Sequence, residues 1–321
     1  MRAARVTRTD GPESVQVLDI PEPVAGPDEV LLEVAAAGVN FPDLLMSRNL
    51  YQYKPELPFT LGGEIAGTVR QAPEGSGFSV GDRVAAYPVV GGFAPLAKAP
   101  VARVLPLPDG IGFVEAACYP LNYLTMLFGL RDRGGLREGE TVLVQGAAGG
   151  IGTASIQIAR ALGARVISVV SSEEKADFAR KVGSHEAVLV DGFRDAVLGL
   201  TGGRGADIVV DPVGGDRFTD SLRSLAPAGR LLVLGFTGGE IPSVKVNRLL
   251  LKNVDVRGVA WGVWSNTHPG VMREMWDDLM ALASTGAIDP PVQHTYGLED
   301  AAEAVGLLAR RGVLGKAVVV P

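Results

Sequence analysis

The 321-residue chain contains very few of the residues that form disulfides and soft-metal sites, with one cysteine and three histidines. A single cysteine, Cys118, excludes an internal disulfide. A zinc site built on cysteine needs more thiolates than this chain contains. A lone thiol is typical of a reducing compartment, so we expect a cytoplasmic protein.

Long apolar runs are also missing. No stretch approaches the roughly 20 consecutive apolar residues that cross a bilayer, and no apolar signal segment follows the first residues. The net charge of −6 argues against nonspecific binding to nucleic acid or to an anionic membrane. We therefore expect neither nucleic acid nor a membrane as a partner.

Glycine is abundant, with 42 residues placed between strongly apolar segments. This placement indicates tight turns and close backbone approaches rather than disorder. The first third of the chain is predicted to form short strands, separated by prolines and turn residues, at 14–20, 30–34, 67–71 and 83–87. Such a region is typical of a small irregular β-barrel.

The pattern changes near residue 112. A helical segment at 113–131 precedes apolar strands at 141–144, 165–170, 187–190, 206–210 and 230–235, with helices at 150–162 and 172–182 between the first of them. Apolar strands separated by helices predict a doubly wound parallel sheet that is covered on both faces. Helices at 269–284 and 298–309 and a closing strand at 316–320 return to the first domain. The predicted fold class is therefore α/β, with a dinucleotide-binding domain at 121–260 inserted into a mainly-β domain of 1–120 and 261–321.

One glycine-rich segment lies between a strand and a helix. Residues 146–152 read Gly-Ala-Ala-Gly-Gly-Ile-Gly, and they depart from the strict Gly-x-Gly-x-x-Gly pattern because that pattern needs a glycine at position 147, where alanine stands. Glycines let the backbone approach a pyrophosphate, and the N–H groups at the start of a helix attract its charge. A turn without a ligand is the alternative. We predict a dinucleotide site, with contacts from Gly146, Ala148, Gly149, Gly150 and Ile151.

The end of the next strand bears on which dinucleotide binds. NAD sites usually carry an acidic residue about 20 positions beyond the glycines, but here Ser171 and Ser172 follow the strand, with Lys175 within one turn. Hydroxyls and a cation suit the 2′-phosphate of NADPH. Ser172 is also suited to cap the following helix with Glu174 as a near capping-box partner, and both roles can hold together. NADPH is the predicted cofactor, although Glu173 and Glu174 add repulsion.

Several further motifs occur in a fixed order along the chain. They are Gly-Val-Asn-Phe-Pro-Asp at 38–43, the segment 51–59, Gly-Gly-Glu-Ile-Ala-Gly at 62–67, Asn-Tyr-Leu-Thr at 122–125 and Asp-Pro-Val-Gly-Gly at 211–215. Together with the glycine-rich segment, they resemble the medium-chain dehydrogenase/reductase superfamily, in its zinc-free quinone oxidoreductase branch. The resemblance covers nearly the whole chain. It implies a Rossmann domain inserted into a GroES-like catalytic domain, and a homodimer formed at the edge of the nucleotide-domain sheet.

The resemblance also bears on metal binding. Zinc alcohol dehydrogenases of this superfamily carry a cysteine where Asn40 stands and a histidine where Gly63 stands, and the three histidines of this chain are scattered. We therefore expect no metal. Hydride would then pass directly from the cofactor, and the resemblance implies a small-molecule quinone or another α,β-unsaturated carbonyl as its acceptor.

Negative charge would then grow on the oxygen of the acceptor, so a hydrogen-bond donor must meet that oxygen. Asn40 and Tyr51 are the candidates, with a turn-stabilising asparagine and a lid aromatic as the alternatives. Lys316 resembles a residue near the cofactor, with a solvated strand end as the alternative. Further predicted cofactor contacts are Thr125, Phe236, Thr237 and Trp261. The alternatives are a helix hydroxyl bonded to its own backbone for Thr125 and a domain-interface aromatic for Trp261. An NADPH-dependent enoyl thioester reductase and an NADPH-binding protein with little catalysis remain alternative functions.

Overall fold

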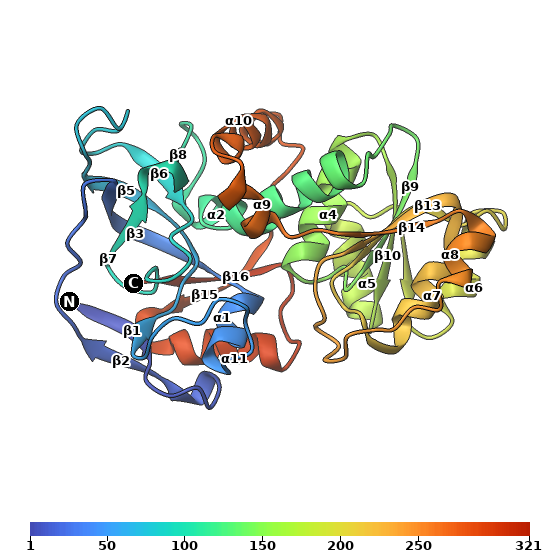
Figure 1. Ribbon diagram of the computed structural model, residues 1–321, viewed down its shortest axis with the longest axis horizontal. Helices are drawn as coiled ribbons and strands as arrows, with labels where there is room; N and C mark the ends of the chain where they lie inside the picture. Colours follow the sequence, from blue (N-terminus) through green and yellow to red (C-terminus); the bar gives the residue numbers. More distant parts are fainter. The chain divides into compact units, whose positions relative to one another are not determined.

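The structure is a computed structural model that describes residues 1–321. Contacts group the chain into two units (Figure 1). Unit 1 comprises Met1–Leu121, Pro269–Asp277 and Pro290–Pro321, and unit 2 comprises Asn122–His268 and Asp278–Asp289. The sequence-based boundary assigned all of 261–321 to the first domain, whereas 261–268 and 278–289 group with unit 2.

Unit 2 is built on a six-stranded sheet in which every neighbouring pair is parallel. In order across the sheet, the strands are β11 (Glu186–Leu189), β10 (Arg165–Val170), β9 (Thr141–Gln145), β12 (Ala206–Asp211), β13 (Leu225–Val233) and β14 (Asp255–Gly258). The order reverses between β9 and β12, which is the switch point where ligands bind open sheets. β9 and β12 are buried along their whole length, which accounts for their unbroken apolar sequences. The predicted doubly wound sheet is confirmed.

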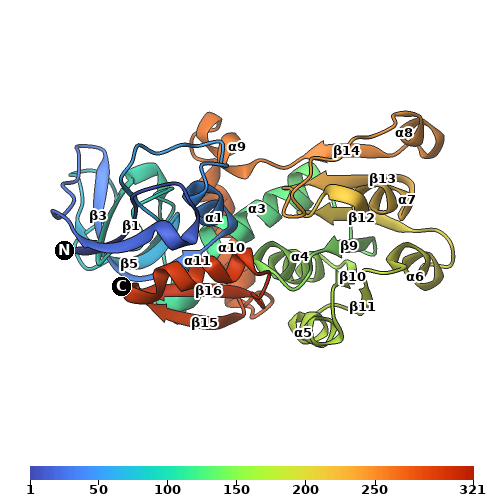
Figure 2. The same ribbon diagram turned by 90° about the horizontal axis from the view of Figure 1, so that it is seen from below.

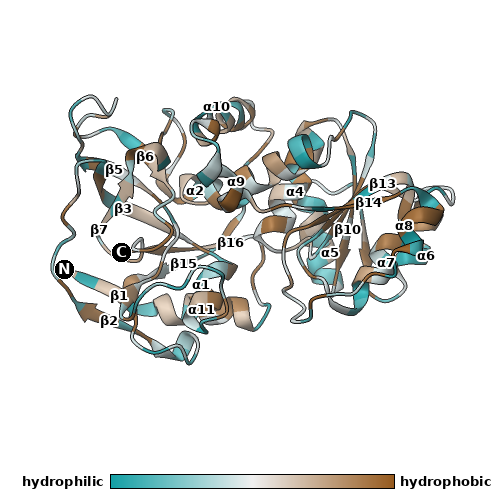
Figure 3. Cartoon of the chain, in the orientation of Figure 1, coloured by the Kyte–Doolittle hydropathy of each residue, from teal (hydrophilic) through white to brown (hydrophobic).

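Helices connect these strands and cover the sheet (Figure 2). They are α4 (Gly150–Ala161), α5 (Glu173–Val182), α6 (Phe193–Leu200), α7 (Phe218–Arg223) and α8 (Asn247–Lys252). Figure 3 shows apolar strands inside the sheet and hydrophilic residues on α5. Before β9 the chain forms α3 (Leu124–Leu127) and the π-helical segment η4 (Phe128–Arg133), and after β14 it forms α9 (Trp261–Thr267). None of the helices is long and apolar enough to cross a membrane.

Unit 1 is mainly β, as predicted, and holds two sheets. The larger sheet has the order β15 (Val292–Gly297), β16 (Lys316–Val320), β3 (Glu29–Val39), β5 (Glu64–Gln71), β6 (Arg83–Ala86) and β8 (Val104–Pro106), and β7 (Leu96–Pro100) pairs with β3. The smaller sheet has the order β2 (Val15–Asp19), β1 (Arg2–Val6) and β4 (Phe59–Thr60). The helices of unit 1 are α1 (Phe41–Ser47), α2 (Phe113–Ala116) and α11 (Ala301–Ala309). The boundary between the two units falls within α10 (Val271–Ser284).

The central strand of unit 1 is longer than its sequence suggests. The pattern predicts a strand at 30–34, but β3 continues to Val39 through Ala-Ala-Ala-Gly. These small residues have weak strand propensity, yet β5 and β16 pair with them on either side. Tertiary pairing therefore extends the strand and carries the chain to Asn40.

Candidate active site

The glycine-rich segment after β9 has the backbone geometry that a phosphate loop needs. Gly146 has φ +60°, in the left-handed region that favours glycine. A Cβ at Gly152 would lie 2.5 Å from the backbone of Ala147, so only glycine fits where α4 packs against the loop. Gly146 is thus required by the turn, and Gly152 by close packing.

The start of α4 is open to an anion. Gly149 is the N-cap and offers no side chain, so the N–H groups of Gly150 and Ile151 lack a side-chain cap. Four N–H groups at a helix start have no partner within the helix, and the helix dipole favours negative charge there. Uncapped N–H groups and an absent Cβ fit a pyrophosphate.

The predicted 2′-phosphate residues lie together at the end of β10. Ser172 Oγ accepts a hydrogen bond from the backbone N–H of Lys175 at 3.3 Å. Ser172 therefore caps α5, which is the capping role that the sequence suggested beside phosphate binding. Lys175 Nζ donates to Ser171 Oγ, also at 3.3 Å. The arrangement places a hydroxyl and an ammonium side by side at the carboxyl edge of the sheet.

The loops after β12 and β13 are bonded to each other. The N–H of Thr237 donates to the carbonyl of Pro212 at 3.1 Å, and Phe236, beside it, is exposed. A Cβ on Gly146 would lie 3.2 Å from Val213 Cγ2, so the phosphate loop lies next to the loop after β12. Hence the predicted residues that follow β9, β10 and β13, which begin at Gly146, Ser171 and Phe236, lie at the carboxyl edge of the same sheet.

Asp211 ends β12 and was not predicted as a site residue, although its motif was recognised. Its Oδ1 accepts the backbone N–H groups of Val213 and Gly214, each at 2.8 Å, and shapes the loop. Its Oδ2 is buried without a partner, and burial raises the pKa of this carboxyl. Its sequence signal was its position at the carboxyl end of a buried strand at the switch point.

Thr125 and Trp261 lie on neighbouring helices of unit 2. Thr125 is a half-buried residue of α3, and α3 contacts both α4 and α9. Trp261 begins α9 and is buried, with its ring 5.6 Å from that of Phe128. Its indole Nε1 is buried without a hydrogen-bond partner, which is uncommon because such a group costs free energy. Their cofactor contacts stay predictions.

In unit 1, the Asn40 side chain makes three hydrogen bonds. Its Nδ2 donates to Glu64 Oε1 at 2.8 Å and to the carbonyl of Gly38 at 3.2 Å, and its Oδ1 accepts from Lys316 Nζ at 2.7 Å. Its backbone N–H donates to Asp43 Oδ2 at 2.8 Å. Both amide hydrogens of Asn40 are thus engaged within the chain.

Lys316 is 1% exposed and Glu64 is 0% exposed, and their Nζ and Oε1 atoms are 2.6 Å apart. Lys316 also donates to the carbonyl of Val39 at 3.3 Å, so three acceptors match its three N–H groups. The alternative interpretation of Lys316 as a solvated strand end is therefore wrong. Sequence reasoning missed Glu64, which stood out only as part of a glycine motif.

Tyr51 follows α1 and packs against the core of unit 1 while remaining partly exposed. Burial raises the pKa of its phenol, the Asp43 carboxyl adds to this effect, and a hydrogen bond with Gln52 opposes it. The hydroxyl therefore keeps its proton at neutral pH, as a hydrogen-bond donor must.

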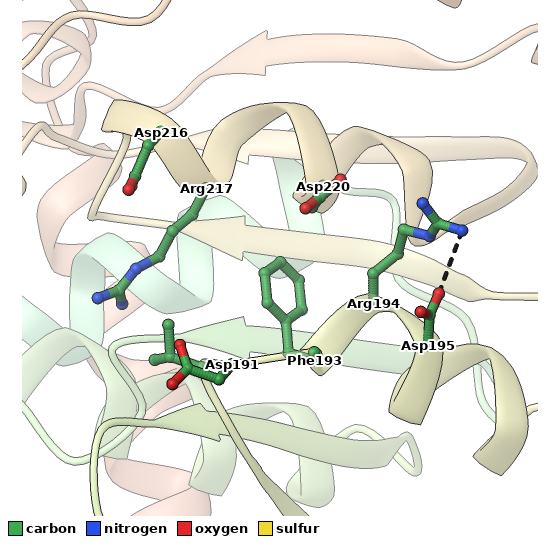
Figure 4. A pocket seen from close by; sticks show the side chains of 9 residues that line it. Asp191, Phe193, Arg194, Asp195, Asp216, Arg217 and Asp220 are labelled. Carbon is green, nitrogen blue, oxygen red and sulfur yellow. Dashed lines mark ion pairs between the residues drawn. The ribbon is translucent and has the colours of Figure 1, made fainter.

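A pocket of about 440 Å³ lies elsewhere in unit 2, at the start of α6 and of the 3₁₀ segment η5 (Gly215–Arg217) (Figure 4). Its lining includes four aspartates and two arginines, with an Arg194–Asp195 ion pair at 3.1 Å. None of the predicted site residues lines it. In neither unit does a group of three potential histidine, cysteine or carboxylate ligands occur.

A parallel sheet with a glycine-rich turn at its switch point, interrupting a mainly-β unit, defines a protein of the dehydrogenase/reductase class. Residues 26–109 match the family described as "Alcohol dehydrogenase GroES-like domain", and residues 150–281 match "Zinc-binding dehydrogenase". A quinone oxidoreductase of Pseudomonas aeruginosa is 37% identical, with 97% of each chain covered.

Solved structures agree with this assignment. A probable oxidoreductase from Mycobacterium abscessus is 45% identical with a TM-score of 0.93, and 100% of this chain and 99% of that chain are covered. A mycobacterial protein solved in complex with NADPH is 34% identical with a TM-score of 0.93, and both chains are covered completely. The chain belongs to the medium-chain dehydrogenase/reductase superfamily, in its quinone oxidoreductase branch, and is an oxidoreductase.

Proposed function

We propose that this protein transfers hydride from NADPH to a quinone or another α,β-unsaturated carbonyl without a metal. The observation that carries the proposal is the uncapped start of α4, next to the Ser171–Lys175 pair at the same sheet edge. The first feature suits a pyrophosphate, and the second suits a 2′-phosphate. The NADPH complex of a relative supports the choice of cofactor.

When bound, NADPH supplies the hydride, and the protein binds and orients its ring. The diphosphate would be held by backbone N–H groups of Gly146, Ala148, Gly149, Gly150 and Ile151. The 2′-phosphate would be held by Ser171, Ser172 and Lys175. Thr125, Phe236, Thr237 and Trp261 are the proposed contacts of the nicotinamide half. Lys316, which the sequence placed near the cofactor, has its three N–H groups engaged by Val39, Asn40 and Glu64, so we do not propose it as a direct contact.

Charge that develops on the acceptor oxygen needs a proton donor nearby. Tyr51 suits this role because its hydroxyl carries a proton and its side chain is partly exposed. Asn40 acts as a second donor only if its 3.2 Å bond to Gly38 opens. Metal-free chemistry follows from the residues at the two ligand positions of the zinc enzymes: Asn40 offers an amide bound to Lys316, and Gly63 offers no side chain.

We also propose that the protein forms a cytoplasmic homodimer. β14 is an edge strand that pairs only with β13. Val256 on β14 is 37% exposed, and Leu250 and Leu251 on the preceding α8 are more than 70% exposed. A second copy would cover this apolar edge and remove an unpaired strand. The cytoplasmic location rests on the single free thiol, Cys118.

The test is NADPH oxidation with quinones, free enones and enoyl thioesters. We expect turnover with quinones or enones, and a Tyr51→Phe variant should lower kcat by about 100-fold because a proton donor is lost. Tyr53→Phe, an exposed tyrosine two residues on, is the control and should leave kcat unchanged. Turnover only with thioesters would make the protein an enoyl reductase, and no turnover with any acceptor would contradict the proposal.

A further inference from the structure

We propose that Lys316 is a positioning residue. Its buried ammonium fixes the orientation of the Asn40 amide and, through Asn40 and Asp43, the first turn of the helix that leads to Tyr51. The inference deepens the proposed function and rests on it wherever turnover is the readout. It also predicts a structural signature at Asn40 that does not depend on turnover.

The ammonium lies in a complete shell of oxygens. Lys316 Nζ is 2.6 Å from Glu64 Oε1, 2.7 Å from Asn40 Oδ1 and 3.3 Å from the carbonyl oxygen of Val39. The second carboxylate oxygen of Glu64 accepts the backbone N–H of Leu121 at 2.7 Å. Charge and hydrogen bonds are therefore both satisfied, which a buried ion pair requires.

Strand register brings these residues together. β16 is antiparallel to β3 with Ala317 opposite Val39, so Lys316 lies beside Asn40 at the end of β3. On the other side of β3, Gly38 is opposite Glu64. A Cβ on Gly38 would lie 2.4 Å from Glu64 Oε1, so the glycine leaves the space that the carboxylate occupies.

Asn40 depends on Lys316 for its direction. With the ammonium present, Oδ1 must face Lys316, and Nδ2 must face Glu64 and Gly38. Without it, Oδ1 loses its donor, and Glu64 is left as an uncompensated buried charge. The amide is then held only through Nδ2, and its Oδ1 end is a buried acceptor without a donor, so the side chain is no longer fixed at both ends.

The network continues into α1. The Asn40 N–H donates to Asp43 Oδ2, and the Gly62 N–H donates to Asp43 Oδ1 at 3.1 Å. The N–H of Leu50, next to Tyr51, donates to the carbonyl of Leu45 in α1 at 2.8 Å. A chain of hydrogen bonds thus runs from Lys316 through Asn40 and α1 toward the proposed donor.

Chemical rescue tests this inference. Lys316→Ala removes the ammonium and leaves a cavity beside Glu64. We expect kcat to fall by about 100-fold, which is the order of loss that misplacement of catalytic groups causes. Methylammonium ions should enter the cavity and restore most of the loss, whereas tetramethylammonium, which has no N–H, should not. NADPH affinity should stay unchanged, and methylammonium should not rescue Lys316→Ala/Glu64→Gln.

The Asn40 side-chain amide gives the second readout, because its ¹H–¹⁵N NMR signals should move in Lys316→Ala and return with methylammonium. This readout applies even if the wild-type protein turns over no acceptor. Failure of the proposed function can therefore be distinguished from failure of the positioning role of Lys316. If Lys316→Ala does not fold, the uncharged pair Lys316→Met/Glu64→Gln serves instead, with the same expected loss of kcat and shifted Asn40 signals. Unmoved Asn40 signals in a folded variant would overturn the inference, whether or not the wild-type protein turns over an acceptor, and so would a kcat equal to that of the wild type.

Discussion

Asp43 is a carboxyl group buried next to the proposed proton donor. It accepts two backbone N–H groups, yet burial raises its pKa from 3.8 to about 7. In the folded protein it therefore stays protonated at pH values where the unfolded chain has already released the proton. Its contribution to the free energy of unfolding is fully present below about pH 4, falls as the pH rises toward 7, and is constant above that.

An Asp43→Asn variant tests this contribution. The difference in unfolding free energy, wild type minus variant, should decrease as the pH rises from about 4 to about 7, by an amount on the order of 4 kcal/mol. Denaturant unfolding at a series of pH values measures it. A difference that stays level or increases over this range would show that Asp43 is ionised in the folded protein.

The sequence indicated some residues of this network and not others. Asn40 and Tyr51 were predicted because they stand at recognisable positions of a family pattern. Glu64 contacts Asn40, which is 24 residues away in the sequence, and Lys316, which is 252 residues away. The roles of Glu64 and Lys316 depend on these contacts. Burial and pairing at such separation leave no local pattern, so a buried ion pair could not be predicted.

At the scale of elements, the phosphate loop was the most predictable part of the protein. Strand β9, the glycines and helix α4 are contiguous, and each carries its own local signal. β10 and β16 match their predicted bounds at 165–170 and 316–320 for the same reason. In contrast, β14 was missed because Asp-Val-Arg-Gly has no apolar run, and the strand exists only through its pairing with β13.

A Gly152→Ala variant tests the phosphate loop. The added Cβ would meet the Ala147 backbone at 2.5 Å and force the loop away from α4. We expect the Kd for NADPH to rise by about 10-fold or more, equivalent to at least 1.4 kcal/mol. Gly199→Ala is the matched control, since that helical glycine has open space around it and an ordinary φ. Equal NADPH affinity for the two variants would contradict the loop's assigned role.

At the scale of the whole molecule, the interrupted topology was predicted and its boundary was not. Residues 278–289 group with unit 2, and side-chain contacts join them to it. Arg131 pairs with Asp278 at 2.7 Å, and the Gln157 amide exchanges two hydrogen bonds with the backbone of Asp289. The local sequence pattern predicts helices and strands. It does not predict contacts between segments more than 130 residues apart, so it could not place the boundary.

The proposed dimer gives a prediction at this scale. Val256→Lys places a charge on the edge strand, which should prevent pairing of two copies. Light scattering should give about twice 33.5 kDa for the wild type and about 33.5 kDa for the variant. Val24→Lys, on an exposed residue of unit 1, should remain dimeric. A wild-type protein that is monomeric, or a Val256→Lys variant that is dimeric, would contradict an interface at β14.

We propose that the start of α4 and the end of β10 bind a phosphorylated nicotinamide dinucleotide, and the other assignments depend on this site. Calorimetric titration of the purified wild-type protein with NADPH and with NADH tests it most directly. We expect saturable binding of NADPH, at least about 10-fold tighter than that of NADH, or about 1.4 kcal/mol. Tighter binding of NADH would contradict the assigned role of Ser171 and Lys175, and no binding of either dinucleotide would contradict the whole account.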